Sequence, residues 1–411
     1  MRFFGNITAP PSKSYEQRVL AGALLSKSIC EIKNYGNSDD VITARNILEK
    51  FGCECIFDNG SIFVNRNQKT KNEEIINCNE SGFCARLFAS IACLFKDEFV
   101  IIGSKSLLKR NIVSDFDIFT KMGITVESTN LKLPVKFSNA KLKSGNFIID
   151  GSCTSQVVSG LIMSLPLLEE DSKLTVKNVS SIDYIYLTIE ILQKFGINIE
   201  NKKINDKDLE IKIKGCQSYK SGIFEIEGDW SGAAFFLVAA AICGQISISG
   251  LNKNSIQADR KILNIFDIAE INYEWKNDNT IEVKKSTIIP FEFDANNCPD
   301  LIPILTILAL FASGKSKIHG TKRLVNKESS RAEVLYQELL KIGANIKLSE
   351  NCIEIFGCGN YIPAKLDSHS DHRIAMAFAI LKSKINIEIE NCECVTKSYP
   401  EFFKNLKDNL G

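Results

Sequence analysis

The chain has 411 residues, a length that suits two or three average domains or two large ones, with ample room for buried cores. Its 50 basic and 49 acidic residues give a formal net charge of +1, so no broad basic field marks a nucleic-acid-binding protein. The longest apolar runs, near 233–243 and 304–312, are well short of the roughly 18 residues that a membrane-spanning helix needs. We therefore expect a soluble protein whose functional cations are placed locally.

The expected location is the cytoplasm, because the sequence opens without a signal-peptide apolar core or an Arg/Ser-rich transit segment. Fourteen cysteines are scattered along the chain, and the close pairs Cys53/Cys55 and Cys392/Cys394 lack the spacing of a zinc knuckle. Only three histidines could add ligands. We expect reduced thiols, no metal site and no organic cofactor.

A helix that ends in glycine and runs into a strand recurs along the chain. The glycines are Gly52, Gly123, Gly196 and Gly343, and a weaker copy at 265–273 lacks the glycine. Each glycine is predicted to be the left-handed residue that ends a helix. The first three lie 71 and 73 residues apart, a period that fits six units of two helices and several strands. The pattern predicts an α/β fold with mixed sheets, in two domains of three units, with a boundary near 227–229.

Several predicted helices begin in clusters of hydroxyl, glycine or charged residues, namely 10–14, 79–82, 151–156, 229–232, 299–300 and 367–373. Taken singly, each start is best explained as an ordinary N-cap, and so are Asp39 and Asp40, to which we assign no chemistry. Caps do not explain the cations about one turn into several of these helices: Lys13, Arg18, Arg86 and Arg373. A cation there opposes the helix dipole, and an anionic ligand between the helix end and the cation would reverse that cost.

The segment 323–331 holds three cations and a carboxylate in nine residues. If a helix starts near Asn326, Lys327 and Arg331 lie four apart and Glu328 and Arg331 three apart on one face. For this segment alone, a solvated salt-bridge face is the better explanation. The alternative is that Glu328 is a proton donor or acceptor beside cations that bind an anion.

In order along nearly the whole chain, these motifs give it a resemblance to the family of 5-enolpyruvylshikimate-3-phosphate synthases (3-phosphoshikimate 1-carboxyvinyltransferases). The matching motifs are Pro-Ser-Lys13-Ser14-x3-Arg18, Glu80-Ser-Gly82-x3-Arg86, Lys109-Arg110, Asp150-Gly-Ser-x-Thr154-Ser155-Gln156, Glu227-Gly-Asp229, Pro299-Asp300, Arg323-x3-Lys327-Glu328-Ser-x-Arg331, Asp371-His372-Arg373 and Thr396-Lys397-Ser-Tyr-Pro. Any one of them is weak, but the ordered set is highly specific.

The resemblance implies a two-domain inside-out α/β barrel of six βαβαββ units, three in each domain. One domain would span 12–228 and hold mainly shikimate 3-phosphate. The other would combine 1–11 with 229–411 and carry Asp300, Glu328 and much of the phosphoenolpyruvate site. The implied enzyme transfers the enolpyruvyl group of phosphoenolpyruvate to the 5-hydroxyl of shikimate 3-phosphate through a tetrahedral intermediate and releases phosphate, a step toward chorismate and the aromatic amino acids.

By the same resemblance, Glu328 handles the methylene proton, Asp300 handles the 5-hydroxyl proton, and Lys13 stands where the two substrates meet. A carboxylate and a lysine suit these tasks because neighbours can bring their pKa values toward neutrality. The residues expected around shikimate 3-phosphate are Ser14, Arg18, Thr154, Ser155, Gln156, Ser181, Tyr184, Asp300, Arg323 and Lys327. Those expected around phosphoenolpyruvate are Lys13, Gly82, Arg110, Gln156, Arg331, Arg373 and Lys397. His372 is expected to form hydrogen bonds rather than act as a base.

Two residues depart from the family pattern. Glu80 stands where many members have Asn, and Phe83 takes a place often held by a small or hydroxyl-bearing residue. Both adjoin Gly82, beside the expected phosphoenolpyruvate pocket, so the affinity for that substrate and the sensitivity to glyphosate stay open.

Two alternative functions are weighed against this one. An enolpyruvyltransferase that acts on UDP-N-acetylglucosamine typically carries a cysteine on a glycine-rich loop, and residues 104–110 contain neither glycine nor cysteine. A non-catalytic phosphate-ligand binding module would be indicated by loss of Asp300 or Glu328, and both are present. The partners we expect are the two small-molecule substrates, with no nucleic acid and no membrane, and the chain is expected to act as a monomer.

Overall fold

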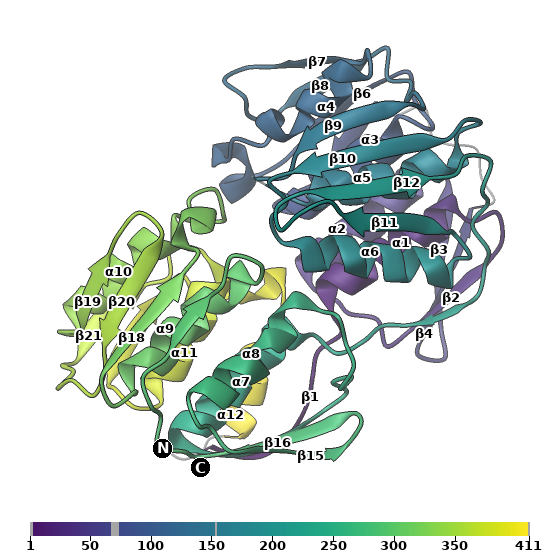
Figure 1. Cartoon of the computed structure of the whole chain (residues 1–411). Coiled ribbons are helices and arrows are strands. Elements are labelled where there is room, and N and C mark those ends of the chain that lie inside the picture. The colour runs from purple at the N-terminus through teal and green to yellow at the C-terminus, as the bar shows by residue number, and fades with distance from the viewer. Residues whose placement is uncertain (1–2, 67–73, 153, 410–411) are drawn as a thin grey trace. The chain divides into compact units, whose positions relative to one another are not determined.

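The computed structural model describes residues 3–66, 74–152 and 154–409, and the chain divides into two compact units (Figure 1). Unit A comprises Lys13–Ile226, and unit B combines Met1–Ser12 with Glu227–Gly411. The chain therefore leaves unit B after Ser12 and returns to it at Glu227. Inside unit B these two connections lie side by side, because the Ser12 amide donates to the Glu227 carbonyl at 2.8 Å.

Unit A is built from helices and strands in alternation. Its helices are α1 Lys13–Leu25, α2 Asp39–Lys50, α3 Gly82–Ala92, α4 Asp117–Lys121, α5 Gln156–Ser164 and α6 Ile182–Lys194, with the short 3-10 helices η1 Lys105–Lys109, η2 Val113–Phe116 and η3 Leu165–Leu167. Its strands are β2 Cys30–Lys33, β3 Cys53–Asp58, β4 Ser61–Arg66, β5 Ile75–Asn77, β6 Glu98–Ile102, β7 Thr125–Ser128, β8 Val135–Ser138, β9 Asn146–Asp150, β10 Ser172–Lys177, β11 Ile199–Lys203, β12 Leu209–Ile213 and β13 Ile223–Glu225.

Unit B repeats the same alternation. Its helices are α7 Trp230–Cys243, α8 Ile262–Ile268, α9 Ile302–Leu310, α10 Arg331–Lys341, α11 His372–Lys382 and α12 Phe402–Asp408, with η4 Ala258–Lys261, η5 Pro299–Leu301, η6 Thr321–Leu324 and η7 Cys392–Lys397. Its strands are β1 Phe3–Thr8, β14 Gly244–Ser249, β15 Tyr273–Asn277, β16 Thr280–Lys284, β17 Glu292–Asp294, β18 Lys315–His319, β19 Asn345–Leu348, β20 Cys352–Phe356, β21 Ala364–Asp367 and β22 Ile387–Glu390.

One strand order recurs through both units. In the described part of unit A the sheets are β13-β2-β4-β3, β5-β6-β8-β7 and β9-β10-β12-β11, and in unit B they are β1-β14-β16-β15, β17-β18-β20-β19 and the pair β21-β22. In every four-stranded sheet the first two strands run parallel and the remaining neighbours run antiparallel. A parallel pair needs a helical crossover and an antiparallel pair needs only a turn, so the consecutive strands of the sheets β5-β6-β8-β7, β9-β10-β12-β11 and β17-β18-β20-β19, with the helices between them, each form a βαβαββ unit. The predicted α/β fold with mixed sheets is confirmed.

The residue that ends each repeated helix adopts the left-handed conformation. Gly52, Gly123, Gly196 and Gly343 have φ between 76° and 85°, as predicted. In the copy without a glycine, Glu270 takes the same position with φ 55°. The repeat is therefore carried by backbone conformation even where the preferred residue is missing.

Central helices of each unit are buried on every side. All residues of α3 and of α9 are buried, as are all those of α7 except Ser231. A helix that is apolar all round belongs inside a core, with the sheets and outer helices around it. Only the ends of such helices can reach a ligand, and Gly82 and Asp300 lie at or just before the N-terminal ends of α3 and α9. No helix within the described ranges is long and apolar enough to span a membrane.

Candidate active site

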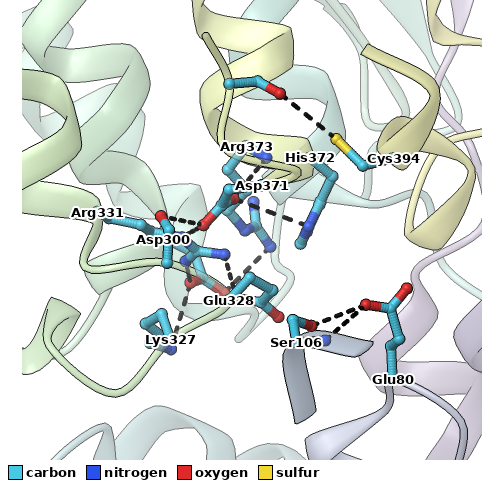
Figure 2. Close-up of polar contacts among 12 residues, drawn as sticks. Glu80, Ser106, Asp300, Lys327, Glu328, Arg331, Asp371, His372, Arg373 and Cys394 are labelled. Atoms are coloured by element: carbon cyan, nitrogen blue, oxygen red, sulfur yellow. Dashed lines mark hydrogen bonds and ion pairs between the residues drawn. The ribbon is translucent and has the colours of Figure 1, made fainter. Parts of the chain in front are cut away.

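Arg331, the first residue of α10, is held by three carboxylates in unit B (Figure 2). Its Nε donates to Asp371 Oδ2 at 2.7 Å, Nη1 to Asp300 Oδ1 at 2.8 Å and Nη2 to Glu328 Oε2 at 2.6 Å. The side chain is 1% exposed. Burial alone would lower the pKa of Arg331, but the charges of Asp371, Glu328 and Asp300 outweigh burial and raise it. Arg331 is therefore a fixed cation around which the site is organised.

Asp300, on η5, contacts two further cations. Its Oδ1 lies 3.4 Å from Lys327 Nζ, and its Oδ2 lies 3.1 Å from Arg373 Nη2. Burial would raise the pKa of Asp300, but Arg373, Lys327 and Arg331 hold it well below its usual value. This direction is opposite to the expected shift toward neutrality, because three cations surround one carboxylate. Asp300 is an ionised acceptor in this state. Burial lowers the pKa of Lys327, a shift toward neutrality that Asp300 opposes.

The prediction that a helix starts near Asn326 is wrong. The 3-10 helix η6 ends at Leu324, residues 325–329 form turns and bends, and α10 begins only at Arg331. The Ser329 hydroxyl helps to hold this irregular segment in place, because it donates to Asp371 Oδ2 at 3.1 Å. Glu328 therefore reaches Arg331 from a turn and not along a helix face. The solvated salt-bridge explanation fails as well, since Arg331 is buried.

Asp371 is the residue that joins this segment to α11. Its Oδ1 accepts from the Arg373 amide at 3.0 Å and so caps the helix, while its Oδ2 accepts from Arg331. Asp371 is fully buried, as is its neighbour His372. Glu328, Asp371 and His372 bring possible ligand atoms within 4.8 Å of one another. Arg331 already binds both carboxylates and would repel a metal ion, so the group is better suited to holding a cation of the protein than a metal.

A second buried acid lies near Asp300. Asp259, on η4, accepts a hydrogen bond from the Ser231 hydroxyl on α7. Burial is the main cause that raises the pKa of Asp259 to about 7, and repulsion from Asp300 adds to it. The other two predicted cations of unit B lie on short 3-10 helices: Arg323 on η6 and Lys397, which is buried, on η7.

Lys13, the first residue of α1 in unit A, has a carboxylate partner. Its Nζ lies 2.9 Å from Asp40 Oδ2, and both side chains are largely buried. The interpretation of Asp40 as a plain helix cap is therefore wrong. Ser38 is the N-cap residue of α2, and Asp40 faces Lys13 instead of solvent. Nothing in the local sequence distinguishes such an acid from a cap, because both favour the first turn of a helix.

Arg18, one turn further along α1, is buried among neutral groups. Its Nε donates to the Thr188 hydroxyl at 2.8 Å, Nη1 to the Ser14 carbonyl at 2.6 Å and Nη2 to the Tyr184 carbonyl at 3.3 Å. Burial lowers the pKa of Arg18 to about 9. Among the described residues, no carboxylate pairs with Arg18, so an anionic ligand could balance its positive charge. Sequence reasoning missed Thr188, which has no motif to mark it.

The start of α3 brings two further arginines together. A Cβ added to Gly82 would lie 3.0 Å from Nη1 of Arg86 and 3.0 Å from Nη1 of Arg110. Arg86 donates to Asp115 Oδ2 at 2.5 Å and to Gln156 Oε1 at 3.1 Å, so its charge is already paired. Because Gly82 has no side chain, these two guanidinium groups can both lie close to its backbone.

Glu80 is hydrogen-bonded to η1 in the same unit. Its Oε1 accepts from both the amide and the hydroxyl of Ser106, at 3.2 and 2.8 Å (Figure 2). Ser106 lies on η1, whose last residue is followed by Arg110. Glu80 therefore fastens the segment that carries Arg110.

Phe83 contacts Arg18. Its ring lies under Arg18, with the guanidinium carbon 4.3 Å from the ring centroid. The Phe83 side chain therefore reaches α1, although its backbone directly follows Gly82.

The remaining predicted residues of unit A lie at the starts of α5 and α6. Thr154 Oγ1 accepts from the Gln156 amide at 3.1 Å, and Ser155 is the buried N-cap residue of α5. Ser181 precedes α6 in the left-handed conformation, with φ 53°. Tyr184 lies with its ring 5.8 Å from the Arg18 guanidinium carbon. Hydrogen bonds tie α3, α5 and α6 together, from Arg86 on α3 to Gln156 at the start of α5 and between the Ser159 hydroxyl on α5 and the Thr188 hydroxyl on α6.

The family model of EPSP synthase (3-phosphoshikimate 1-carboxyvinyltransferase) matches residues 1–406 of this chain. The chain belongs to the EPSP synthase family. A curated family member from Clostridium perfringens, a 3-phosphoshikimate 1-carboxyvinyltransferase, is 34% identical over 414 residues, with 99% of this chain and 96% of the relative covered. Another from Clostridium kluyveri is 36% identical over 412 residues, with 99% and 95% covered.

Two solved structures share the fold of this EPSP synthase family member. The EPSP synthase from Acinetobacter baumannii superimposes with a TM-score of 0.81 at 22% identity and covers 99% of this chain and 96% of its own. The enolpyruvyl transferase NikO from Streptomyces tendae gives 0.77 at 13% identity, with 99% and 95% covered. At these identities the likeness is one of fold, and the family rests on the sequence matches.

Proposed function

We propose that this chain catalyses the reaction named by its family, the transfer of the enolpyruvyl group of phosphoenolpyruvate to the 5-hydroxyl of shikimate 3-phosphate. The family match over residues 1–406 supports the reaction. The observation that carries the chemistry is Arg331 bound at once to Asp300, Glu328 and Asp371. Two of these three carboxylates are the proposed proton carriers, so one buried cation fixes both.

Shikimate 3-phosphate is proposed to bind unit A through the helix starts of α1, α5 and α6, with Lys327, Arg323 and Asp300 as further contacts. Arg18 suits the ring carboxylate, because it is a buried cation whose described contacts are all neutral. The hydroxyls of Thr154 and Ser155 suit the phosphate, because an anion is favoured at the N-terminal end of a helix. Ser14, Gln156, Ser181 and Tyr184 complete the proposed set.

Phosphoenolpyruvate is proposed to bind the cations Lys13, Arg110, Arg331, Arg373 and Lys397, with Gly82 and Gln156 beside it. This substrate carries a phosphate and a carboxylate, both of which arginine binds in bidentate fashion. Arg331 and Arg373 now face carboxylates of the protein, at 2.6–3.1 Å. An incoming anion therefore competes with Asp300 and Glu328 for the same guanidinium groups.

This competition gives Glu328 its proposed role. When an anionic substrate takes over part of Arg331, Glu328 loses a stabilising cation and gains a negative neighbour, so its affinity for a proton rises. Glu328 then delivers a proton to the methylene carbon, while the 5-hydroxyl oxygen attacks the adjacent carbon and gives up its proton to the ionised Asp300. Loss of phosphate from the tetrahedral intermediate, with return of a methyl proton to Glu328 and transfer of the Asp300 proton to the departing phosphate, completes the reaction and restores both carboxyl groups to their starting states.

The cytoplasm is the proposed location, because both substrates are charged metabolites that do not cross membranes unaided. A monomer is proposed because every residue assigned to the site belongs to one chain; light scattering on the purified protein tests this.

Phosphate release tests the function. We expect release from phosphoenolpyruvate only when shikimate 3-phosphate is supplied, and none with UDP-N-acetylglucosamine in its place. Release with the nucleotide sugar would assign the sister reaction, and release with neither acceptor would favour a binding module.

A further inference from the structure

We propose that Phe83 positions Arg18 for the carboxylate of shikimate 3-phosphate, by covering one face of the guanidinium so that its terminal N–H groups keep a fixed direction. This inference rests on the proposed function. It makes Phe83 a positioning residue on the shikimate side, and not a part of the phosphoenolpyruvate pocket.

The geometry of the stack carries the proposal. The guanidinium carbon of Arg18 lies 4.3 Å from the centroid of Phe83, well within the range of about 6 Å for a cation–π contact. Phe83 is 8% exposed and Arg18 is 1% exposed, so water screens the contact little. A cation–π contact is strongest when it is desolvated in this way.

The hydrogen bonds of Arg18 show which of its N–H groups the stack keeps in a fixed direction. A guanidinium has five N–H donors, and the described residues accept one each from Nε, Nη1 and Nη2. One donor on each terminal nitrogen is thus left for a ligand, the number that a bidentate carboxylate requires. Thr188, which fixes Nε, is itself held by the Tyr184 carbonyl at 2.8 Å and the Ser159 hydroxyl at 2.9 Å. The edge and the face of the guanidinium are therefore both set before a ligand arrives.

The direction of the Phe83 side chain is the reason why we expect it to affect the binding of shikimate 3-phosphate and not that of phosphoenolpyruvate. Gly82 lies next to Arg86 and Arg110, while the neighbouring side chain of Phe83 leaves that region and reaches α1. Members of the family with a small residue at this position would have no aromatic ring to offer to Arg18. We therefore expect Phe83 to alter the recognition of shikimate 3-phosphate in this chain.

The test compares Phe83→Leu with Phe83→Tyr and with a matched control. Leucine keeps the bulk of the side chain and removes the ring, whereas tyrosine keeps the ring. Phe95→Leu is the control, because Phe95 makes the same kind of stack with Arg66, at 5.1 Å, elsewhere in unit A. For each variant the KM of each substrate and kcat come from phosphate release, and the Kd of shikimate 3-phosphate comes from calorimetry on the full-length protein.

For Phe83→Leu we expect the Kd and KM of shikimate 3-phosphate to rise roughly 2- to 12-fold, the fold-change that corresponds to ordering one long side chain on binding. The KM of phosphoenolpyruvate should change much less. Phe83→Tyr and Phe95→Leu should stay close to the wild type. In an Arg18→Lys background, Phe83→Leu should add little, because lysine has no planar face to be covered.

A rise in the KM of phosphoenolpyruvate without a change for shikimate 3-phosphate would overturn the proposal, as would an unchanged Kd for shikimate 3-phosphate. If the wild type binds shikimate 3-phosphate but releases no phosphate, the proposed reaction fails while the calorimetric comparison still decides the role of Phe83.

Discussion

Replacing Glu270 by glycine is expected to stabilise the protein. Glu270 is exposed and holds φ 55° at the position where four other copies of the repeat have glycine. It ends its helix with the same hydrogen bond as they do, because the Ile271 amide donates to the Phe266 carbonyl at 2.8 Å, as Ile197 does to Leu192 at 2.9 Å. The glutamate therefore accepts the left-handed conformation at a cost that glycine does not have.

The magnitude follows from two opposing terms. A residue with a side chain costs about 1–2 kcal/mol in the left-handed region. Glycine loses more backbone entropy on folding, roughly 0.5–1 kcal/mol. The balance predicts a gain of about 0.5–1 kcal/mol, which corresponds to a rise of roughly 1–4 °C in Tm for a unit of this size.

Gly343→Ala is the reciprocal control in the same unit. Gly343 has φ 77°, and a Cβ there would meet only the Asn360 carbonyl at 3.9 Å, so no clash confuses the result. We expect it to lower the Tm by a similar amount. Scanning calorimetry measures both variants. A Glu270→Gly protein that melts below the wild type, or a Gly343→Ala protein that melts above it, would refute the reasoning.

Three further predictions concern buried acids. Asp371→Asn should lower the free energy of unfolding by about 1.5–3 kcal/mol, because Arg331 loses a charged partner, and Asp371→Ala by about 1 kcal/mol more, because asparagine still caps α11 and alanine does not; equal losses in denaturant melts would contradict this. Asp259 binds a proton more tightly when folded, so the wild type should lose stability as the pH rises from about 4 to about 7. Asp259→Asn should flatten that slope in pH-dependent melts, and an unchanged slope would rule Asp259 out as its source. Asp40→Asn should lower kcat/KM roughly 10- to 100-fold, since Lys13 loses a charge-assisted hydrogen bond, while Asp39→Asn on the same turn should have little effect; equal effects in the phosphate-release assay would deny Lys13–Asp40 a special role.

The fold was predictable because it repeats. One local signal, a helix that ends in glycine before a strand, occurs often enough to give the period, and the period gives the number of units. The copy at Glu270 was recognisable only from its neighbours, since its own sequence lacks the glycine. Helix ends are encoded locally, and this is why they can be read from a single sequence.

The contacts of the site were harder to predict because they join distant segments. Asp40 reaches Lys13 across 27 residues, and Asp371 reaches Arg331 across 40. Neither spacing has a local pattern. The segment 325–330 also shows how long-range bonds override helical periodicity, because the contacts that Ser329 and Arg331 make with Asp371 accompany a turn where the charge spacing suggested a helix. The direction of the Phe83 side chain could not be read from its place beside Gly82.

In the proposed mechanism Glu328 carries the methylene proton while Arg331 holds the Glu328 carboxylate in place. The measurement that tests it most directly is single turnover of Glu328→Gln, with the binding of both substrates measured on the same protein. We predict that both substrates still bind with affinities within severalfold of the wild type, while turnover falls by roughly 10²- to 10⁴-fold, the usual contribution of a general acid–base group. Weakened binding with unchanged turnover of each bound complex would contradict the claim.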